Sequence, residues 1–273
     1  MTDSITVTDL HKSYGKNEVL RGVTFNVKQG ETFALLGING AGKTTAIECI
    51  ENMRRPDSGE ILVNGTLGIQ LQSTSLPDTI TSAEAMRLFC AWRRTPYRKD
   101  LLQRFGMAGE YLNKTYASLS AGRKRRLHLA LALCHNPNIL ILDEPTAGLD
   151  AEGRHSLHDE IRSLKSEGVS ILMATHDMSE AETLCDRIAI LHKGAIVKLG
   201  SPLELTADSS IHSKITVKTR LNPDYRTFSA VNITEFLTEF LSEIRSDNDE
   251  LLDLRISRAD IEDIFLETAG GAD

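Results

Sequence analysis

The segment Gly37–Thr45 constrains the fold of this 273-residue chain more than any other stretch. Its sequence, GINGAGKTT, matches the phosphate-loop pattern G-x-x-x-x-G-K-[ST]. In such a loop the glycines leave room for backbone N–H groups that wrap a phosphate. The run 32–36 before it predicts a buried strand, and the run 46–51 after it predicts a helix. This order of strand, loop and helix predicts an α/β fold that binds a nucleoside triphosphate.

The loop offers several kinds of group to a triphosphate. Lys43 brings a positive charge that can reach the outer phosphates, and the Thr44 hydroxyl is a ligand of the kind that Mg²⁺ prefers. The helix N-terminus adds its own preference for anions. We expect the triphosphate to be bound by Gly37, Asn39, Gly40, Ala41, Gly42, Lys43, Thr44 and Thr45.

Composition excludes several classes of protein. A net charge of −7 and a pI near 5.7 argue against a general nucleic-acid binder, so we expect no nucleic-acid partner. The four cysteines show no C-x-x-C spacing, which indicates neither a metal site nor a disulfide framework. The longest apolar run, 139–142, is far shorter than the ~20 residues that span a bilayer. These features predict a soluble cytoplasmic protein that reaches a membrane only through a partner.

The pattern of the sequence changes along the chain. Residues 3–77 alternate strand-like segments with turns, whereas about 78–135 are helical and begin with a capping box at Thr81–Glu84. Residues 136–200 return to the strand and helix alternation of a parallel sheet. The sequence therefore predicts a main domain over 1–205 that contains a helical subdomain at about 78–135.

Residues 206–273 predict a small appended α+β domain. Strand-like segments lie at 215–217 and 252–256, and a final helix runs through Leu266. Between the strands, Phe236, Phe240, Leu241 and Ile244 form a helical stripe. Such a stripe is more often a core face than a binding site, although both interpretations stay open.

A second strong motif is the apolar run 139–142 followed by Asp143 and Glu144. A phosphate-loop enzyme needs carboxylates beside its metal. We expect Asp143 to hold the Mg²⁺ shell and Glu144 to act as general base on the attacking water. Standing alone, this pattern would be an ordinary strand that ends in solvated acids.

Between these motifs lies the segment Leu119-Ser120-Ala121-Gly122, and with it the chain resembles the nucleotide-binding subunits of ABC (ATP-binding cassette) transporters. The order of phosphate loop, glutamine, L-S-x-G segment, I-L-I-L-D-E-P strand and lone histidine carries the resemblance over residues 1–205. It implies a RecA-like core with an antiparallel β subdomain and an α-helical subdomain, and ATP with Mg²⁺ as cofactors.

The resemblance also implies roles for single residues. Tyr14 matches the aromatic that stacks on adenine, although a plain surface tyrosine is the alternative. Gln72, rather than Gln70, matches the glutamine that senses Mg²⁺ and the γ-phosphate. His176 matches the switch histidine that contacts the γ-phosphate, and Asp150 belongs to a loop that crosses to a second subunit.

The L-S-x-G segment serves the nucleotide of a second subunit in the resembling family. Ser120 and Gly122 keep the groups that reach that γ-phosphate, whereas Ala121 and Arg123 depart from the usual L-S-G-G-Q. Ala121 restricts the backbone modestly. Arg123 either adds charge near the triphosphate or turns outward, and we interpret both changes as tolerated variation.

The resemblance implies an ATPase that closes as a homodimer around two nucleotides and drives a separately encoded membrane permease. The closing run 261–267 resembles that of bacterial drug- and antibiotic-exporting members, which favours export. Two alternatives stay open at this point. One is a soluble ATPase that acts on ribosomes or DNA, and the other is a regulatory module that switches by dimerising.

Overall fold

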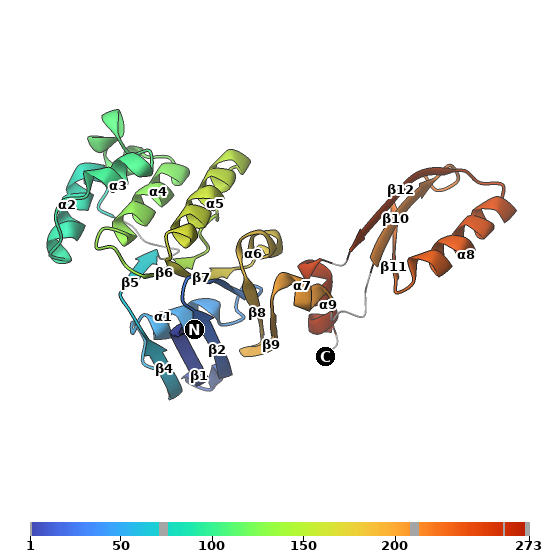
Figure 1. The fold of residues 1–273 in the computed structure, drawn as a ribbon, viewed down its shortest axis with the longest axis horizontal. Coiled ribbons are helices and arrows are strands. Elements are labelled where there is room, and N and C mark those ends of the chain that lie inside the picture. Colours follow the sequence, from blue (N-terminus) through green and yellow to red (C-terminus); the bar gives the residue numbers. More distant parts are fainter. Residues whose placement is uncertain (1, 71–75, 208–212, 259, 271–273) are drawn as a thin grey trace. The chain divides into compact units, whose positions relative to one another are not determined.

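The computed structural model of the chain describes residues 2–70, 76–207, 213–258 and 260–270. The chain divides into two compact units, Met1–Lys198 and Leu199–Asp273 (Figure 1). Within the described ranges, every helix is too short or too polar to cross a membrane.

The first unit is built on a sheet whose described strands run in the order β5-β6-β7-β3-β8-β9. The neighbours β5–β6, β6–β7, β7–β3 and β3–β8 are parallel, so the carboxyl ends of these strands lie at one edge of the sheet. The strands are β5 (Leu67–Gln70), β6 (Ile139–Asp143), β7 (Ser170–Thr175), β3 (Thr32–Leu36), β8 (Arg187–His192) and β9 (Ala195–Gly200). In open α/β sheets this edge is where ligands bind.

Helices also follow the central strands of this sheet. They are α1 (Lys43–Ile50) after β3, α5 (Ala151–Ser166) after β6 and α6 (Met178–Leu184) after β7. Helix α5 buries Leu157, Ile161 and Leu164, the apolar stripe that its sequence predicts. Strands β3, β6 and β7 are buried along their whole length, as parallel strands covered on both faces require.

An antiparallel sheet packs against α1 on one side of this core. Its described strands, in the order β2-β1-β4, are β2 (Asn17–Lys28), β1 (Asp3–Tyr14) and β4 (Ser58–Val63). Ile5, Val7 and Phe25 from this sheet share one apolar core with Ile47 of α1 and Phe33 of β3. The phosphate loop is thereby anchored between two sheets.

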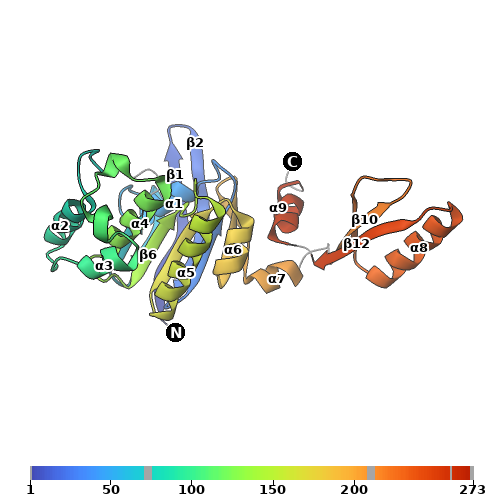
Figure 2. The same cartoon turned by 90° about the horizontal axis from the view of Figure 1, so that it is seen from above.

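A helical segment joins β5 to β6. It contains α2 (Ser82–Trp92), α3 (Lys99–Arg104), 3-10 turns at Gly109–Leu112 and Tyr116–Ser118, and α4 (Ala121–Ala132). The predicted capping box is present, because Thr81 and Glu84 bond each other's backbone N–H groups at the start of α2. Figures 1 and 2 show these helices grouped at one side of the first unit, and Figure 1 shows them away from β1, β2 and β4.

The second unit contains α7 (Pro202–Ala207), β10 (Ser213–Thr219), β11 (Arg226–Ala230), α8 (Ile233–Ser246), β12 (Leu251–Arg258) and α9 (Ile261–Gly270). Its described strands form an antiparallel sheet in the order β11-β10-β12. Phe236 and Phe240 of α8 pack on Ile215 and Val217, so the stripe is a core face except at Leu241, which is 47% exposed. The structure adds β11 and α7, which the sequence did not predict.

Candidate functional site

The phosphate loop occupies the turn between β3 and α1, and its glycines are required by geometry. Gly40 and Gly42 have φ angles of +82° and +111°, in the region that side chains disfavour. Gly37 has ordinary dihedrals, but a Cβ there would lie 2.5 Å from the carbonyl oxygen of Leu191. The loop therefore lies close against β8 and leaves its outer side open.

Lys43 is a buried cation at the first position of α1. Its Nζ donates hydrogen bonds to the carbonyl oxygens of Gly37 at 2.7 Å and Ile38 at 3.2 Å. Burial lowers the pKa of this ammonium group, and the nearby carboxylates of Glu144 and Asp143 oppose that shift. An incoming phosphate would give this ammonium group a stronger partner than the loop carbonyls.

Asp143 is the last residue of β6 and is 2% exposed. Its Oδ2 accepts a hydrogen bond from the Thr44 hydroxyl at 3.2 Å, while its buried Oδ1 has no partner among the described residues. Burial raises the pKa of this carboxyl group, and the hydrogen bond from Thr44 opposes that shift.

A hydroxyl beside an unpartnered carboxylate oxygen fits Mg²⁺, which prefers oxygen ligands. Within the described ranges, no group of three or more His, Cys, Asp or Glu side chains could hold a metal ion without other ligands. Phosphate oxygens and water would complete the shell, as is usual for Mg²⁺ in nucleotide sites.

Glu144 lies just beyond β6 with a φ of +49°, an uncommon conformation for a residue with a side chain. Its backbone N–H donates to the carbonyl oxygen of Ala174 on β7 at 2.9 Å. Its Oε2 lies 2.7 Å from Nδ1 of His176, and its Oε1 lies 3.6 Å from Nζ of Lys43. The structure therefore brings Lys43, Asp143, Glu144 and His176 together at the carboxyl edge of the sheet.

A cavity of about 520 Å³ opens beside these groups. It is lined by Asn17, Val19, Asn39, Gly40, Gly42, Lys43, Thr44, Thr45 and Glu144. Tyr14 ends strand β1 just before Asn17 and is 42% exposed, with the cations of Lys12 and Arg54 lying 5.7 Å and 5.4 Å from its ring centroid.

Ser120, Gly122 and Asp150 lie at a different cavity, of about 350 Å³. Two helix N-termini meet there. Ser120 caps α4 by accepting a hydrogen bond from the Arg123 N–H, and Asp150 caps α5 by accepting one from the Gly153 N–H at 2.8 Å. The residues that line this cavity share no member with those of the phosphate-loop cavity. Within one chain, the predicted site therefore falls into two parts.

The structure decides the orientation of Arg123 within the chain. Its guanidinium donates a hydrogen bond to the carbonyl oxygen of Gly106 and lies 4.0 Å from the ring centroid of Tyr111. Arg126, on the same helix, donates to the hydroxyl of Ser156 at 2.9 Å. These basic side chains connect α4 to the turns that follow α3 and to α5. Gln72, the remaining predicted site residue, lies outside the described residues.

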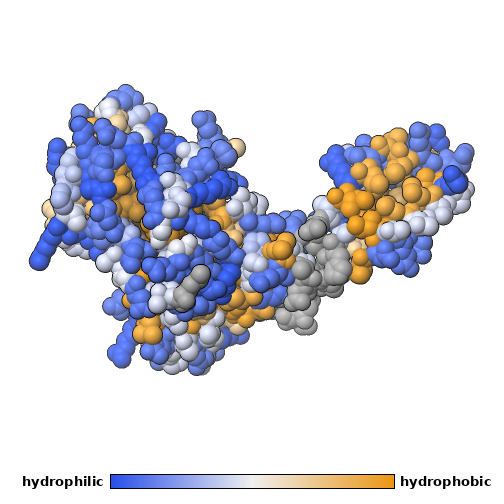
Figure 3. Space-filling model, in the orientation of Figure 1, coloured by the Kyte–Doolittle hydropathy of each residue, from blue (hydrophilic) through white to orange (hydrophobic). Residues whose placement is uncertain are grey.

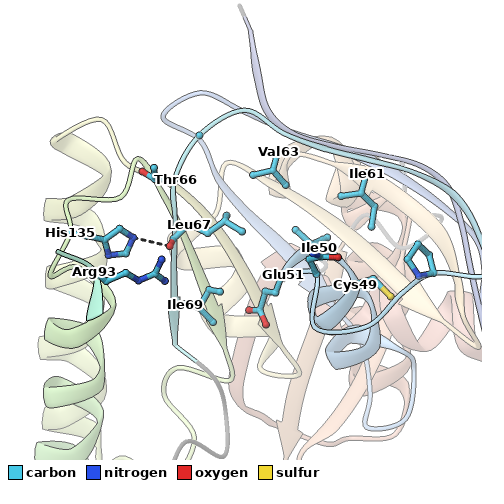
Figure 4. Close-up of a pocket in the computed structure, with 13 residues that line it drawn as sticks. Cys49, Ile50, Glu51, Ile61, Val63, Thr66, Leu67, Ile69, Arg93 and His135 are labelled. Atoms are coloured by element: carbon cyan, nitrogen blue, oxygen red, sulfur yellow. Dashed lines mark hydrogen bonds between the residues drawn. The ribbon is translucent and has the colours of Figure 1, made fainter. Parts of the chain in front are cut away.

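A third cavity, of about 660 Å³, lies at the C-terminal end of α1 between β4, β5 and the helical segment (Figure 4). Glu51 projects into it, and neither of its carboxylate oxygens has a partner among the described residues. Burial, with smaller contributions from Asp143 and Glu48, raises the pKa of Glu51 to about 8. Sequence analysis missed this cavity, because no motif marks Glu51.

Comparison with known proteins places these features in one family. Residues 20–147 match the family model described as ABC transporter. The Nod factor export ATP-binding protein I of Ralstonia nicotianae is 35% identical over 75% of this chain and 69% of its own length. The linearmycin resistance ATP-binding protein LnrL of Bacillus subtilis is 29% identical over 96% of this chain and 97% of its own length.

A solved structure agrees with these relatives. A protein described as the ATP binding subunit of an ABC transporter superposes with a TM-score of 0.68 at 30% identity. The alignment covers 76% of this chain and 92% of that structure.

Proposed function

The chain belongs to the family of ATP-binding proteins of ABC transporters, and on this premise we propose that it hydrolyses ATP in a head-to-tail homodimer that drives a separately encoded permease. Members of this family are ATPases, and the chain is one of them. Peripheral attachment to the cytoplasmic face of the membrane through that permease belongs to the same proposal.

The observation that carries the proposal is the division of the site into two cavities. The phosphate-loop cavity is lined by Lys43, Thr44 and Glu144, whereas neither Ser120 nor Gly122 of the same chain is among its lining residues. The second cavity presents two helix N-termini, which favour an anion. In a two-fold dimer, each such surface would meet the nucleotide bound by the other copy, which gives two equivalent composite sites.

Within each composite site the side chains would divide the work of phosphoryl transfer. Glu144 would accept the proton of the attacking water, and His176 would hold that carboxylate and contact the γ-phosphate. Lys43 would stabilise the charge that develops on the phosphate oxygens. Bound Mg²⁺, held by Thr44 and Asp143, would neutralise phosphate charge.

The remaining assignments rest on the family resemblance. Tyr14 would stack on adenine, Asp150 would lie at the dimer interface, and Gln72 would sense the metal and the γ-phosphate. Residues 1–205 would form the ATPase domain and residues 206–273 an accessory domain.

Export is the direction that the relatives favour, because their names describe Nod factor export and linearmycin resistance. We place the permease contact at the Glu51 cavity, which lies between α1 and the helical segment (Figure 4). Leu67 and Ile69 of strand β5 and Arg93 and His135 of the helical segment all line this cavity, so a docked permease segment would contact both.

The proposal is tested by Glu144→Gln, which keeps the shape of the side chain and removes its basicity. We expect ATP binding to persist, hydrolysis to fall by about 10²–10⁴-fold, and ATP to shift the chain to a dimer in light scattering. Glu239→Gln, on the exposed face of α8, is the matched control and should behave as wild type. Unchanged turnover in Glu144→Gln would remove Glu144 as the base. A stable complex with ribosomes, with none at membranes, would favour the soluble alternative.

A further inference from the structure

An apolar row on β12 is left uncovered in the second unit. Leu254 and Ile256 stand directly opposite Val217 and Ile215 of β10, so all four side chains lie on the face of the sheet that α8 covers. Val217 and Ile215 are buried under Phe240 of α8, yet Leu254 and Ile256 are 36% and 46% exposed. Leu252, two residues before Leu254 at a register shift between β10 and β12, is 54% exposed. Figure 3 shows apolar atoms at the surface along the strands of this unit.

The backbone of the same strand is also available. In the described sheet β11-β10-β12, strand β12 has a neighbour on one side only. An edge strand presents unpaired N–H and C=O groups to any strand that can lie beside it. An apolar row on an open edge is therefore a surface that fits another β-strand.

The sequence of β12 is complementary to itself in one antiparallel register. If a two-fold axis passes through Leu254, Leu252 faces Ile256 of the second copy, and Asp253 faces Arg255 of the second copy. An axis through Asp253 or through Arg255 would place like charges directly opposite each other, which is destabilising. A shift by one residue would bring charged side chains against the apolar row.

We propose that β12 pairs with β12 of a second copy of this chain, antiparallel and in register about Leu254, so that the two C-terminal sheets form one continuous sheet. This contact would be isologous, because the same strand serves both copies. Its apolar face would join Leu252, Leu254 and Ile256 of both copies. On its other face, Asp253 and Arg255 form an ion pair of 3.0 Å within each chain, and each would also meet the opposite charge of the other copy. The contact goes beyond the ATP-dependent dimer proposed above, because it involves no residue of the nucleotide site.

Cross-linking of the full-length chain tests the contact. The four native cysteines are buried, so a short bis-maleimide should react first with a cysteine introduced on the surface. We expect Leu254→Cys to give a covalent dimer in at least fivefold higher yield than Val231→Cys, a control that is 68% exposed and lies outside β12. The yield is read without nucleotide, so loss of ATP binding would leave it unaffected. Equal yields for the two variants would overturn the proposal.

The register is tested by mixing two variants. Leu252→Cys and Ile256→Cys should cross-link with each other more than either does alone, because like positions would lie about 14 Å apart along the strand. A charge exchange gives a second test in the Leu254→Cys background. Asp253→Arg should lower the yield and Asp253→Arg with Arg255→Asp should restore it. No recovery in the double exchange, or cross-links only to another protein, would contradict the proposed pairing.

Discussion

Glu144 and His176 follow neighbouring strands and are joined by a hydrogen bond of 2.7 Å between Oε2 and Nδ1. The φ of +49° at Glu144 costs roughly 1 kcal/mol for a residue with a side chain. The bond from its N–H to the Ala174 carbonyl holds this conformation. A strained backbone conformation persists where surrounding contacts hold it in place. At Glu144 this conformation points the side-chain carboxylate towards the phosphate-loop cavity.

Replacing His176 with alanine should release that carboxylate. We expect hydrolysis to fall by about 10²-fold or more, with ATP affinity changed only slightly because Lys43 and the loop remain. His155→Ala, at an exposed position on α5, is the control. Steady-state ATPase assays and nucleotide titration check the result. Wild-type turnover in His176→Ala would show that the contact is structural.

Two glycines of the phosphate loop should respond differently to alanine. In Gly37→Ala the new Cβ would meet the Leu191 carbonyl at 2.5 Å, so β3 and β8 must move apart. In Gly40→Ala nothing lies within 4 Å, and only the positive φ costs about 1 kcal/mol. Thermal unfolding without nucleotide should therefore show the larger loss of stability for Gly37→Ala. The reverse order would contradict the close approach of the loop to β8.

Ser120→Phe should block hydrolysis without weakening ATP binding to the single chain, because Ser120 lies at the second cavity. Lys43→Ala should lose tight ATP binding. Mixing these two inactive variants should restore part of the activity, since one composite site in a mixed dimer would contain an intact phosphate loop and an intact Ser120. A mixture that stays inactive would argue against the shared site.

Glu51→Gln should change how stability depends on pH. The pKa of Glu51 is raised from 4.5 to about 8 in the folded chain, so between these values the folded state holds a proton that the unfolded state releases. The contribution of Glu51 to the free energy of unfolding is therefore at its most favourable below about pH 4.5, and it declines as the pH rises towards 8. Because Glu51 is only partly buried, we expect Glu51→Gln to be more stable than wild type at pH 8 by about 1–2 kcal/mol and similar near pH 5. Urea unfolding at both pH values measures the difference, and parallel pH profiles would disprove it.

The sequence predicted the fold and family well because its motifs are local. The phosphate loop and the strand before Asp143 can each be predicted from a few consecutive residues. The family match confirms the ABC-type fold. The roles of single site residues remain predictions. The sequence did not predict strand β11, because the run 226–230 has no clear alternation of apolar and polar residues.

Other features could not be predicted because they depend on partners distant in the chain. The contact of Arg123 with Gly106 and Tyr111 joins α4 to a segment whose placement the sequence does not reveal. The burial of Glu51 arises where α1 meets strands β4 and β5. Neither contact leaves a periodic pattern, so only the structure shows it.

Helix α1 has one more consequence. Lys43 at its first turn lines the phosphate-loop cavity, and Cys49 and Ile50 at its last turn line the Glu51 cavity. An eight-residue helix is about 12 Å long. If the permease binds at the Glu51 cavity as proposed, a displacement of the first turn on ATP binding would move the last turn with it, because both turns belong to one hydrogen-bonded helix.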